Sequence, residues 1–264
     1  MPLPLLCSHM LNDKSCLFRR LMMPAVLYSA AVLMLVNVTM VHAGVVIGGT
    51  RFIYGEQLRS ITFSVRNTSE TAYLLNTKVF SGGAWAGSDR PITAPAPFIA
   101  TPPLFPLAGG RENSIRIVRT GGELPADRES LFTLSISSIP SGRGGPDSIQ
   151  MAVRSSLKLF YRPAGLKGDP ENAYKQLKWS RAGKHVIVEN PTPYYVTLFQ
   201  LKANGREFDN AGLVAPFSQR KESWCGETAS CQLYWQTIND YGRVMPAVSL
   251  MVETGKANSV VEHK

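Results

Sequence analysis

The sequence is poor in the residues that most often carry catalytic chemistry. It has four histidines and four cysteines among 264 residues, and its acidic residues are scattered rather than paired. A nucleophilic site of the Ser-His-Asp or Cys-His kind would have to use His185, which lies in a strand-like stretch beside a turn. A histidine in that setting is more typical of the surface end of a strand. The sequence therefore predicts a protein that is not an enzyme.

Two further signatures of small-molecule chemistry are missing. No glycine-rich loop leads into a predicted helix, so the sequence offers no obvious binding site for a nucleotide phosphate. Ser155 and Lys158 match the Ser-x-x-Lys spacing of penicillin-recognising enzymes, but that chemistry needs both residues on one helix face, and here the pattern is that of a strand. We therefore expect no cofactor and no metal.

Negative charge is also scarce. The 28 lysines and arginines outnumber the 19 aspartates and glutamates, which gives a formal net charge of +9. A basic protein can bind nucleic acid, anionic lipid or acidic protein surfaces. The basic residues are scattered along the chain instead of forming blocks, which disfavours a nucleic-acid partner.

Residues 1–43 have the plan of a secretory signal peptide. Basic residues precede the largely apolar run 21–38, and small residues lead up to Ala43, where we expect cleavage. The alternative is a membrane anchor, because the run is close to the ~20 residues that a span needs. The translation start stays open between Met1 and the internal methionines Met10, Met22 and Met23.

Only two cysteines follow this leader. Cys225 and Cys231 are six positions apart, and an exported compartment permits a disulfide between them. A redox pair would more typically be Cys-x-x-Cys, and a zinc site would need more ligands. We therefore expect one disulfide that closes a small loop.

Nearly every periodic segment of the exported part alternates apolar and polar residues with a period of two, and turn clusters separate the segments. Without sustained helical periodicity, this pattern predicts an all-β protein built of two immunoglobulin-like β-sandwiches. The break at 162–170, with its two prolines and two glycines, divides domain 44–163 from domain 164–255. A polar tail, 256–264, is expected to be frayed. The predicted strands lie near 45–54, 58–67, 71–80, 96–101, 113–119, 131–139, 149–161, 174–179, 185–190, 194–201, 212–215, 218–223, 231–238 and 244–252.

The most informative of these strands is 149–161. Its apolar row contains Met151, Val153 and Leu157, with Ser155 as a small polar interruption, because alternate side chains of a strand share a face. If this strand lies at a sheet edge, it can pair with another chain through main-chain hydrogen bonds. Taken alone, the row favours the alternative that Met151, Val153 and Leu157 face the core of their own domain.

Five phrases of the sequence stand out together: Ala100–Pro103, Asp127–Phe132, Lys158–Pro163, Glu189–Thr197 and Ile238–Gly242. They resemble, in the same order, phrases of the PapD-like family of periplasmic pilus (fimbrial) assembly chaperones. This family is already an established example of the immunoglobulin-like sandwich and of strand addition between chains. The short connection 140–148 is similar to the short-loop branch of the family.

This resemblance implies a fold and a function. Such chaperones have two immunoglobulin-like domains set at an angle, like a boomerang. They bind pilus subunits in the periplasm by donor-strand complementation, in which the chaperone lends a strand to an incomplete subunit sandwich. They then deliver the subunits to an outer-membrane usher, and no nucleotide is consumed. Related chaperones can also dimerise through the lending edge.

The resemblance also implies roles for particular residues. Arg51 and Lys158 would bind the C-terminal carboxylate of a subunit, and an ion network between the domains would set their angle. The lent strand would run from Gln150 to Lys158. Its residues would be Gln150, Met151, Val153, Ser155 and Leu157, and the network would be Glu129, Arg162 and Asp240.

Two other functional classes compete with the chaperone. A two-domain immunoglobulin-like surface adhesin or carbohydrate-binding protein would share the fold, but it should lack the phrase Lys158–Pro163 and the ionic residues. A hydrolase would need a nucleophile and base pair, which the sequence lacks. The sequence names neither the cognate subunits nor the usher, and it does not identify the type of pilus.

Overall fold

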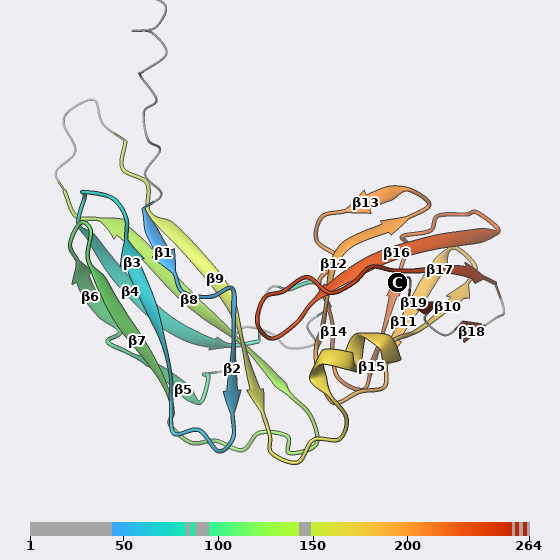
Figure 1. Cartoon of the computed structure of the whole chain (residues 1–264), viewed down its shortest axis with the longest axis horizontal. Helices are drawn as coiled ribbons and strands as arrows, with labels where there is room; N and C mark the ends of the chain where they lie inside the picture. The colour runs from blue at the N-terminus through green and yellow to red at the C-terminus, as the bar shows by residue number, and fades with distance from the viewer. Residues whose placement is uncertain are drawn as a thin grey trace, which may run out of the picture. The chain divides into compact units, whose positions relative to one another are not determined.

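A computed structural model describes residues 44–82, 85–87, 95–142, 149–254, 257–258 and 261–262. The predicted signal peptide and most of the connection 140–148 lie outside these residues. The described chain is built of strands, apart from one short 3-10 helix, and it forms two sandwiches of two sheets each (Figure 1). The predicted all-β fold class is therefore confirmed.

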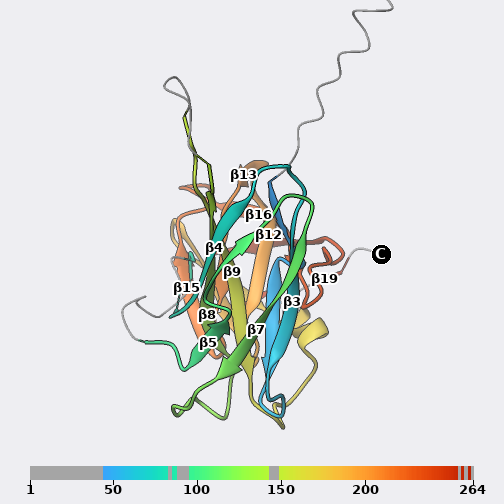
Figure 2. The same cartoon turned by 90° about the vertical axis from the view of Figure 1, so that its left-hand side faces the viewer.

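The first sandwich packs a four-stranded sheet against a five-stranded sheet (Figure 2). In strand after strand, alternate residues are buried between the two sheets; Phe63 and Val65 are buried, for example, while Arg66 is exposed. The smaller sheet has the order β1 (Val45–Ile47), β3 (Ile61–Asn67), β7 (Glu112–Arg119) and β5 (Phe98–Thr101). The larger has the order β2 (Arg51–Gly55), β9 (Val153–Arg162), β8 (Ser130–Pro140), β4 (Tyr73–Ser81) and β6 (Leu104–Leu107).

The first segment of the described chain changes sheet between β1 and β2. β1 pairs with β3 in the smaller sheet, whereas β2 pairs in parallel with β9 in the larger one. The glycines at 48 and 49 lie at this crossing, where the amide of Gly48 donates to the carbonyl of Ser64. The predicted single strand 45–54 is therefore two strands, and the position of this crossing decides how much of β9 gains a second neighbour.

The second sandwich has a core around two tryptophans. The rings of Trp179 and Trp235 are both fully buried, and their centroids are 4.7 Å apart. One sheet has the order β15 (Ser218–Glu222), β11 (His185–Asn190), β10 (Lys178–Ala182) and β18 (Ala257–Asn258). The other has β13 (Arg206–Phe208), β12 (Val196–Ala203), β16 (Ser230–Ile238), β17 (Val248–Glu253) and β19 (Val261–Glu262), and β14 (Leu213–Val214) pairs with β12.

The structure differs from the predicted strands in several places, and it contains strands such as β6 and β13 that were not predicted. The first half of the strand expected at 174–179 belongs to the 3-10 helix η1 (Pro170–Gln176), and only residues 178–179 lie in a strand, β10. The helix forms because Asp169 caps it by accepting from the amide of Glu171 and Pro170 begins its first turn. The strand expected at 149–161 begins only at Val153. The prediction of a frayed tail is also wrong in part, because residues 257–258 pair with β10 and residues 261–262 pair with β17.

The predicted disulfide is present. Cys225 and Cys231 are joined at an S–S distance of 2.06 Å and are both buried in the second sandwich. Arg181, also buried, donates to the carbonyls of Gly226 and Thr228 in the closed loop, so the loop is fixed to β10 as well. No helix in the described part of the chain is long and apolar enough to cross a membrane.

Candidate functional site

Arg51 and Lys158 lie directly opposite each other on neighbouring strands. β2 begins at Arg51, and the parallel register pairs Arg51 with Lys158 and ends with Gly55 paired with Arg162. Two cations are thus brought together at the point where β2 starts to cover β9. This is the juxtaposition expected from the resemblance.

Arg51 is held by groups of the second sandwich. Its guanidinium donates to the carbonyl of Ile238 at 2.8 Å and to the hydroxyl of Thr197 at 2.9 Å, and it lies 5.7 Å from the centroid of the Phe160 ring. Burial lowers the pKa of Arg51, although Asp240 and Glu129 oppose this. Within the described residues no carboxylate is within ion-pair distance of Arg51, so its charge is fixed in place without being neutralised.

Lys158 is also cationic and lacks a carboxylate partner in the described part of the chain. Its ammonium lies 3.8 Å from the centroid of the Trp85 ring. Burial, with a smaller contribution from the charge of Arg51, lowers the pKa of Lys158 to about 8. Two half-shielded cations side by side form a site suited to a single anion, which would relieve their mutual repulsion.

Strand β9 is paired on both sides along only half its length. β8 pairs with it from Val153 to Tyr161, whereas β2 pairs with it only from Lys158 to Arg162. Residues 153–157 therefore have one edge with no strand partner among the described residues. This open edge ends at Lys158, beside Arg51.

The predicted apolar row along the open edge divides into an exposed part and a buried part. Met151 and Val153 are 73% and 57% exposed, Ser155 is half-buried, and Leu157 packs against the core of the first sandwich. Gln150 and Met151 precede the strand, and the Gln150 amide donates to the carbonyl of Gly142. The alternative that the whole row faces its own core is thus wrong for Met151 and Val153 and holds for Leu157.

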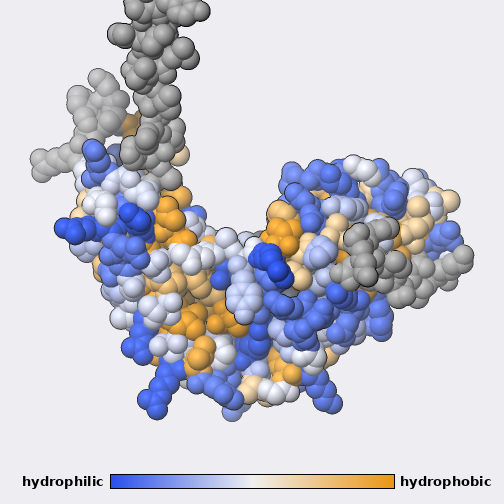
Figure 3. Space-filling model, in the orientation of Figure 1, coloured by the Kyte–Doolittle hydropathy of each residue, from blue (hydrophilic) through white to orange (hydrophobic). Residues whose placement is uncertain are grey.

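Apolar surface is unevenly distributed over the molecule. Figure 3 shows it gathered on the first sandwich, with a more polar second sandwich. Most of the exposed large apolar side chains come from the first sandwich, and Ile149, at 90% exposure, extends the exposed row of β9. Exposed apolar patches of this kind commonly mark interaction surfaces.

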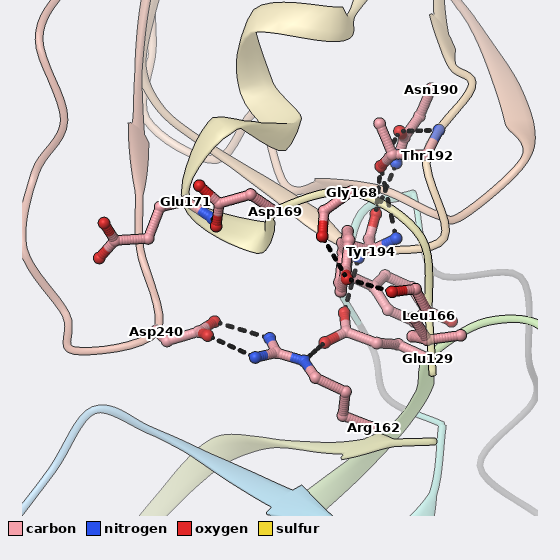
Figure 4. A network of polar contacts seen from close by, with 11 residues as sticks. Glu129, Arg162, Leu166, Gly168, Asp169, Glu171, Asn190, Thr192, Tyr194 and Asp240 are labelled. Atoms are coloured by element: carbon pink, nitrogen blue, oxygen red, sulfur yellow. Dashed lines mark hydrogen bonds and ion pairs between the residues drawn. The ribbon is translucent and has the colours of Figure 1, made fainter. Parts of the chain in front are cut away.

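Glu129, Arg162 and Asp240 form one ionic network (Figure 4). Arg162 donates from Nε to Glu129 at 2.7 Å, and its two terminal nitrogens bind both oxygens of Asp240 at 2.7 and 3.0 Å. Glu129 also accepts from the amide of Tyr195 at 2.8 Å. Because Arg162 belongs to β9 and Asp240 follows β16, the network joins the two sandwiches.

Burial and ion pairing shift the pKa values of the two shielded groups of this network for different reasons. Burial raises the pKa of Glu129 to about 7, although Arg162 and the amide of Tyr195 favour the carboxylate. Hydrogen bonds and charge from Asp240 and Glu129 raise the pKa of Arg162 despite its burial. Arg162 is therefore the permanent charge on which both carboxylates depend.

Asn190 holds the turn that supplies Tyr195 by hydrogen bonds. Asn190 donates to the carbonyl of Tyr194 at 2.7 Å and accepts from the amide of Thr192 at 3.0 Å (Figure 4). Arg162 lies 5.3 Å from the centroid of the Tyr194 ring. The phrase Glu189–Thr197 thus contributes a preformed donor for Glu129.

Trp85 is a site residue that sequence reasoning missed. It belongs to the connection between β4 and β5, and it packs with Leu131, Phe160 and Leu213. Its neighbours in sequence are alanines and glycines, which indicate only a turn. The one available signal is a large aromatic residue within such a turn.

None of the described residues forms a group that could hold a metal ion. His185, the one histidine that could have served a nucleophile, begins β11 beside a hairpin turn and pairs with Ala182. The arrangement can bind an anion and an extended chain.

Comparison with known proteins agrees with this geometry. Residues 44–167 match the N-terminal domain of the pili and flagellar-assembly chaperone PapD, and residues 172–249 match the C-terminal domain of the pili assembly chaperone PapD. The chain is 47% identical over 213 residues to an uncharacterized fimbrial chaperone of Escherichia coli, YcbF, covering 80% of this chain and 90% of the relative. It is 36% identical over 218 residues to the chaperone protein FimC of Escherichia coli, covering 80% and 86%.

Solved structures give the same result. The Escherichia coli chaperone DraB superposes with a TM-score of 0.65 at 34% identity, covering 80% of this chain and 97% of DraB. The SafB chaperone of Salmonella enterica, solved in complex with the SafA pilin, gives a TM-score of 0.69 at 30% identity, with coverage of 80% and 97%. These matches favour the chaperone over the adhesin, and the chain belongs to the PapD-like family of pilus assembly chaperones.

Proposed function

We propose that this protein binds pilus subunits by lending them the open edge of β9, and that Arg51 and Lys158 bind the subunit's C-terminal carboxylate. The observation that carries this proposal is the half-paired strand. Residues 153–157 offer main-chain groups along one edge, and the edge ends at two cations without carboxylate partners in the described chain. The SafB chaperone, which resembles this chain, has been solved with a pilin bound, which supports the assignment.

The open edge suits strand addition. An added strand satisfies the free amides and carbonyls, and alternate side chains of the lent strand reach into the partner. Met151 and Val153 are the exposed apolar side chains on this row. Burying each of them in a subunit groove would contribute about 1.5–3 kcal/mol.

The cation pair fixes the register of the added strand. A carboxylate between Arg51 and Lys158 accepts charge-assisted hydrogen bonds, each worth about 1.5–3 kcal/mol when shielded from water. A shift by one residue would turn every side chain of the added strand to the opposite face. The anchor therefore decides which subunit residues lie beside Met151 and Val153.

Three further parts of the proposal concern the setting. The protein acts in the periplasm, delivers its subunits to an outer-membrane usher, and can shield its open edge by self-association. The buried disulfide fits an oxidising compartment. Strand exchange at a half-paired edge needs no nucleotide, which agrees with a function that is not enzymatic.

The proposed anchor can be tested by co-expressing a fimbrial subunit with Arg51→Ala or Lys158→Ala and isolating complexes from the periplasm. Each variant should fold and recover less than about a tenth of the wild-type complex, because a single charge-assisted bond, at about 1.5–3 kcal/mol, is worth more than the ~1.4 kcal/mol that corresponds to about tenfold in affinity. Lys78→Ala is the matched control, since Lys78 is an exposed lysine of the same sheet. Wild-type recovery with both anchor variants would remove the anchor.

A further inference from the structure

Trp85 lies beside Lys158 but does not belong to β9, the strand that contains Lys158. The ammonium of Lys158 is 3.8 Å from the centroid of the indole ring, within the range of a cation–π contact. Arg51, the other cation of the pair, is opposite Lys158 in the strand register. The indole is therefore a neighbour of the anion site, contributed by the connection between β4 and β5.

The position of Trp85 is set by contacts with the second sandwich. The carbonyl of Ala86, the next residue, accepts from the amide of Leu213 at 2.7 Å, and the Trp85 ring packs with Leu213 and Phe160. The segment 85–87 is thus fixed to β14 by a backbone hydrogen bond and by apolar contact.

Two glycines permit this close approach. A β-carbon on Gly87 would lie 2.0 Å from the carbonyl oxygen of Leu213, and one on Gly212 would lie 2.1 Å from the carbonyl oxygen of Ala86. Both glycines also have positive φ, 77° in each case, which other residues rarely adopt. The Arg220 side chain lies next to Gly87 and donates to the carbonyls of Ala211 and Leu213.

The position of Trp85 lowers the stability of the free protein. Its indole N–H is buried and has no hydrogen-bond partner among the described residues. A buried donor without a partner destabilises a fold. Burial also makes Lys158 harder to charge. Both costs are understandable if the indole serves a ligand that arrives later.

We propose that Trp85 is a positioning residue for the subunit terminus, because its ring holds the Lys158 ammonium at a fixed place shielded from water, ready for a carboxylate. A shielded cation binds a carboxylate more strongly than a hydrated one, and salt screens the pair less. This inference rests on the proposed carboxylate anchor. It adds a residue that gives the site its preference for a free terminus.

The test uses a synthetic nonapeptide of alternating valine and threonine, prepared once with a free carboxylate and once with an amide terminus. Calorimetry gives the affinity of both forms for the full chain without its leader. Wild type should prefer the free acid, and Trp85→Ala should reduce that preference about tenfold, as the loss of one shielded charge contact predicts. Binding of the amide form should change less than about twofold.

Two further variants distinguish the effect of the Trp85 ring from the effect of the loop that carries it. Trp85→Phe retains a ring face and removes the unpaired N–H, so the preference for the free acid should stay within about threefold of wild type. Phe217→Ala removes the ring of another cation–π pair, in which the Arg128 guanidinium is 5.0 Å from the Phe217 centroid. It should leave the preference unchanged.

The salt dependence of the preference for the free-acid peptide is a second measurement, and Trp85→Ala should not change it if Trp85 only supports the fold. Raising NaCl from about 0.1 M to about 1 M shortens the screening length from about 10 Å to about 3 Å. At about 1 M NaCl, wild type should keep most of its preference for the free-acid peptide, whereas Trp85→Ala should lose the preference that it still shows at about 0.1 M NaCl.

The ways in which the test can fail are distinguishable. If wild type binds acid and amide peptides equally, the carboxylate anchor itself is wrong, and the role of Trp85 is rejected with it. If wild type prefers the acid but Trp85→Ala weakens both peptides equally, Trp85 only supports the fold and the proposal is overturned. An unchanged preference in Trp85→Ala overturns it as well.

Discussion

The two halves of β9 show how one strand can serve both binding and folding. In the covered half, 158–162, residues 158–161 lie between β2 and β8 and Arg162 pairs with β2 alone; Leu159, Phe160 and Tyr161 are buried. Residues 153–157 pair only with β8 in the described structure, and Val153 is largely exposed. The alternation of side chains is continuous across both halves. What differs is the neighbour, and the start of β2 at Arg51 decides where one half ends.

Substitutions in the two halves of β9 should therefore affect different properties of the protein. In the covered half, side chains contribute to stability, while in the open half they are available to a partner. Each half contains an arginine and an apolar residue of the same row, so the comparison can be tested on one strand with matched substitutions.

The largest effect is expected from the two arginines. Arg162→Ala would leave Glu129, whose side chain is 2% exposed, as a buried carboxylate without its cation. Breaking a buried pair from one side costs about 3–5 kcal/mol. Arg154→Ala, in the open half, removes an exposed side chain and should change stability by less than about 0.5 kcal/mol. Urea unfolding of both variants measures the contrast.

Equal stability of Arg154→Ala and Arg162→Ala would show that the network does not stabilise the fold. Glu129→Ala serves as an additional check, because it removes the buried carboxylate and leaves Arg162 with Asp240. It should lower the melting temperature by less than Arg162→Ala does.

The next contrast concerns the apolar row. Leu159 is fully buried, and Leu159→Ala should destabilise the protein by about 2–5 kcal/mol through lost contacts and a cavity. Val153→Ala should change stability by less than about 0.5 kcal/mol because Val153 is mostly exposed, yet it should weaken subunit binding.

Thermal unfolding and recovery of subunit complexes, measured on the same preparations, test this pair. A strongly destabilised Val153→Ala would mean that the first half of β9 is packed within its own domain. Unimpaired complex recovery with Val153→Ala would argue against its insertion into a subunit.

Much of this architecture follows from local patterns in the sequence. The alternation in 61–66 and 131–137 indicated strands, and the prolines and glycines of 162–170 indicated the break. β3 has one buried face as its alternation suggests, whereas residues 130–136 of β8 are buried on both faces. The Cys225–Cys231 bridge followed from spacing and compartment. Such features depend on neighbours in sequence, so the sequence alone can indicate them.

Other features depend on contacts between distant segments. Sequence periodicity showed that Met151, Val153 and Leu157 share a row, but the place where β2 begins to cover that row depends on the crossing at 48–49. The cation pair and the ionic network came from resemblance, since Arg51 and Lys158 are 107 positions apart (158 − 51). The only local signal for Trp85 was a large aromatic residue within a turn, which does not place it in the site, because its position is set by β14.

The smallest expected effect concerns Lys158, which lies where the two halves meet. Burial lowers its pKa in the folded protein to about 8 from the ordinary value of 10.5. The folded state therefore binds fewer protons than the unfolded state between these pH values, and stability rises with pH across that window. Below pH 8 the charged lysine destabilises the free fold. After allowance for its contact with Trp85 and for residual hydration, the effect is about 1 kcal/mol.

Lys158→Met should consequently stabilise the free protein by about 1 kcal/mol at about pH 7, while it weakens the binding of a subunit. The advantage over wild type should shrink between pH 8 and pH 10.5, because the wild-type ammonium loses its proton in the folded state there. Urea unfolding of both proteins at about pH 7 and about pH 10 measures this difference. A variant that is less stable than wild type at neutral pH would show that the contact with Trp85 outweighs desolvation, and that Lys158 belongs to the stabilising half of the strand.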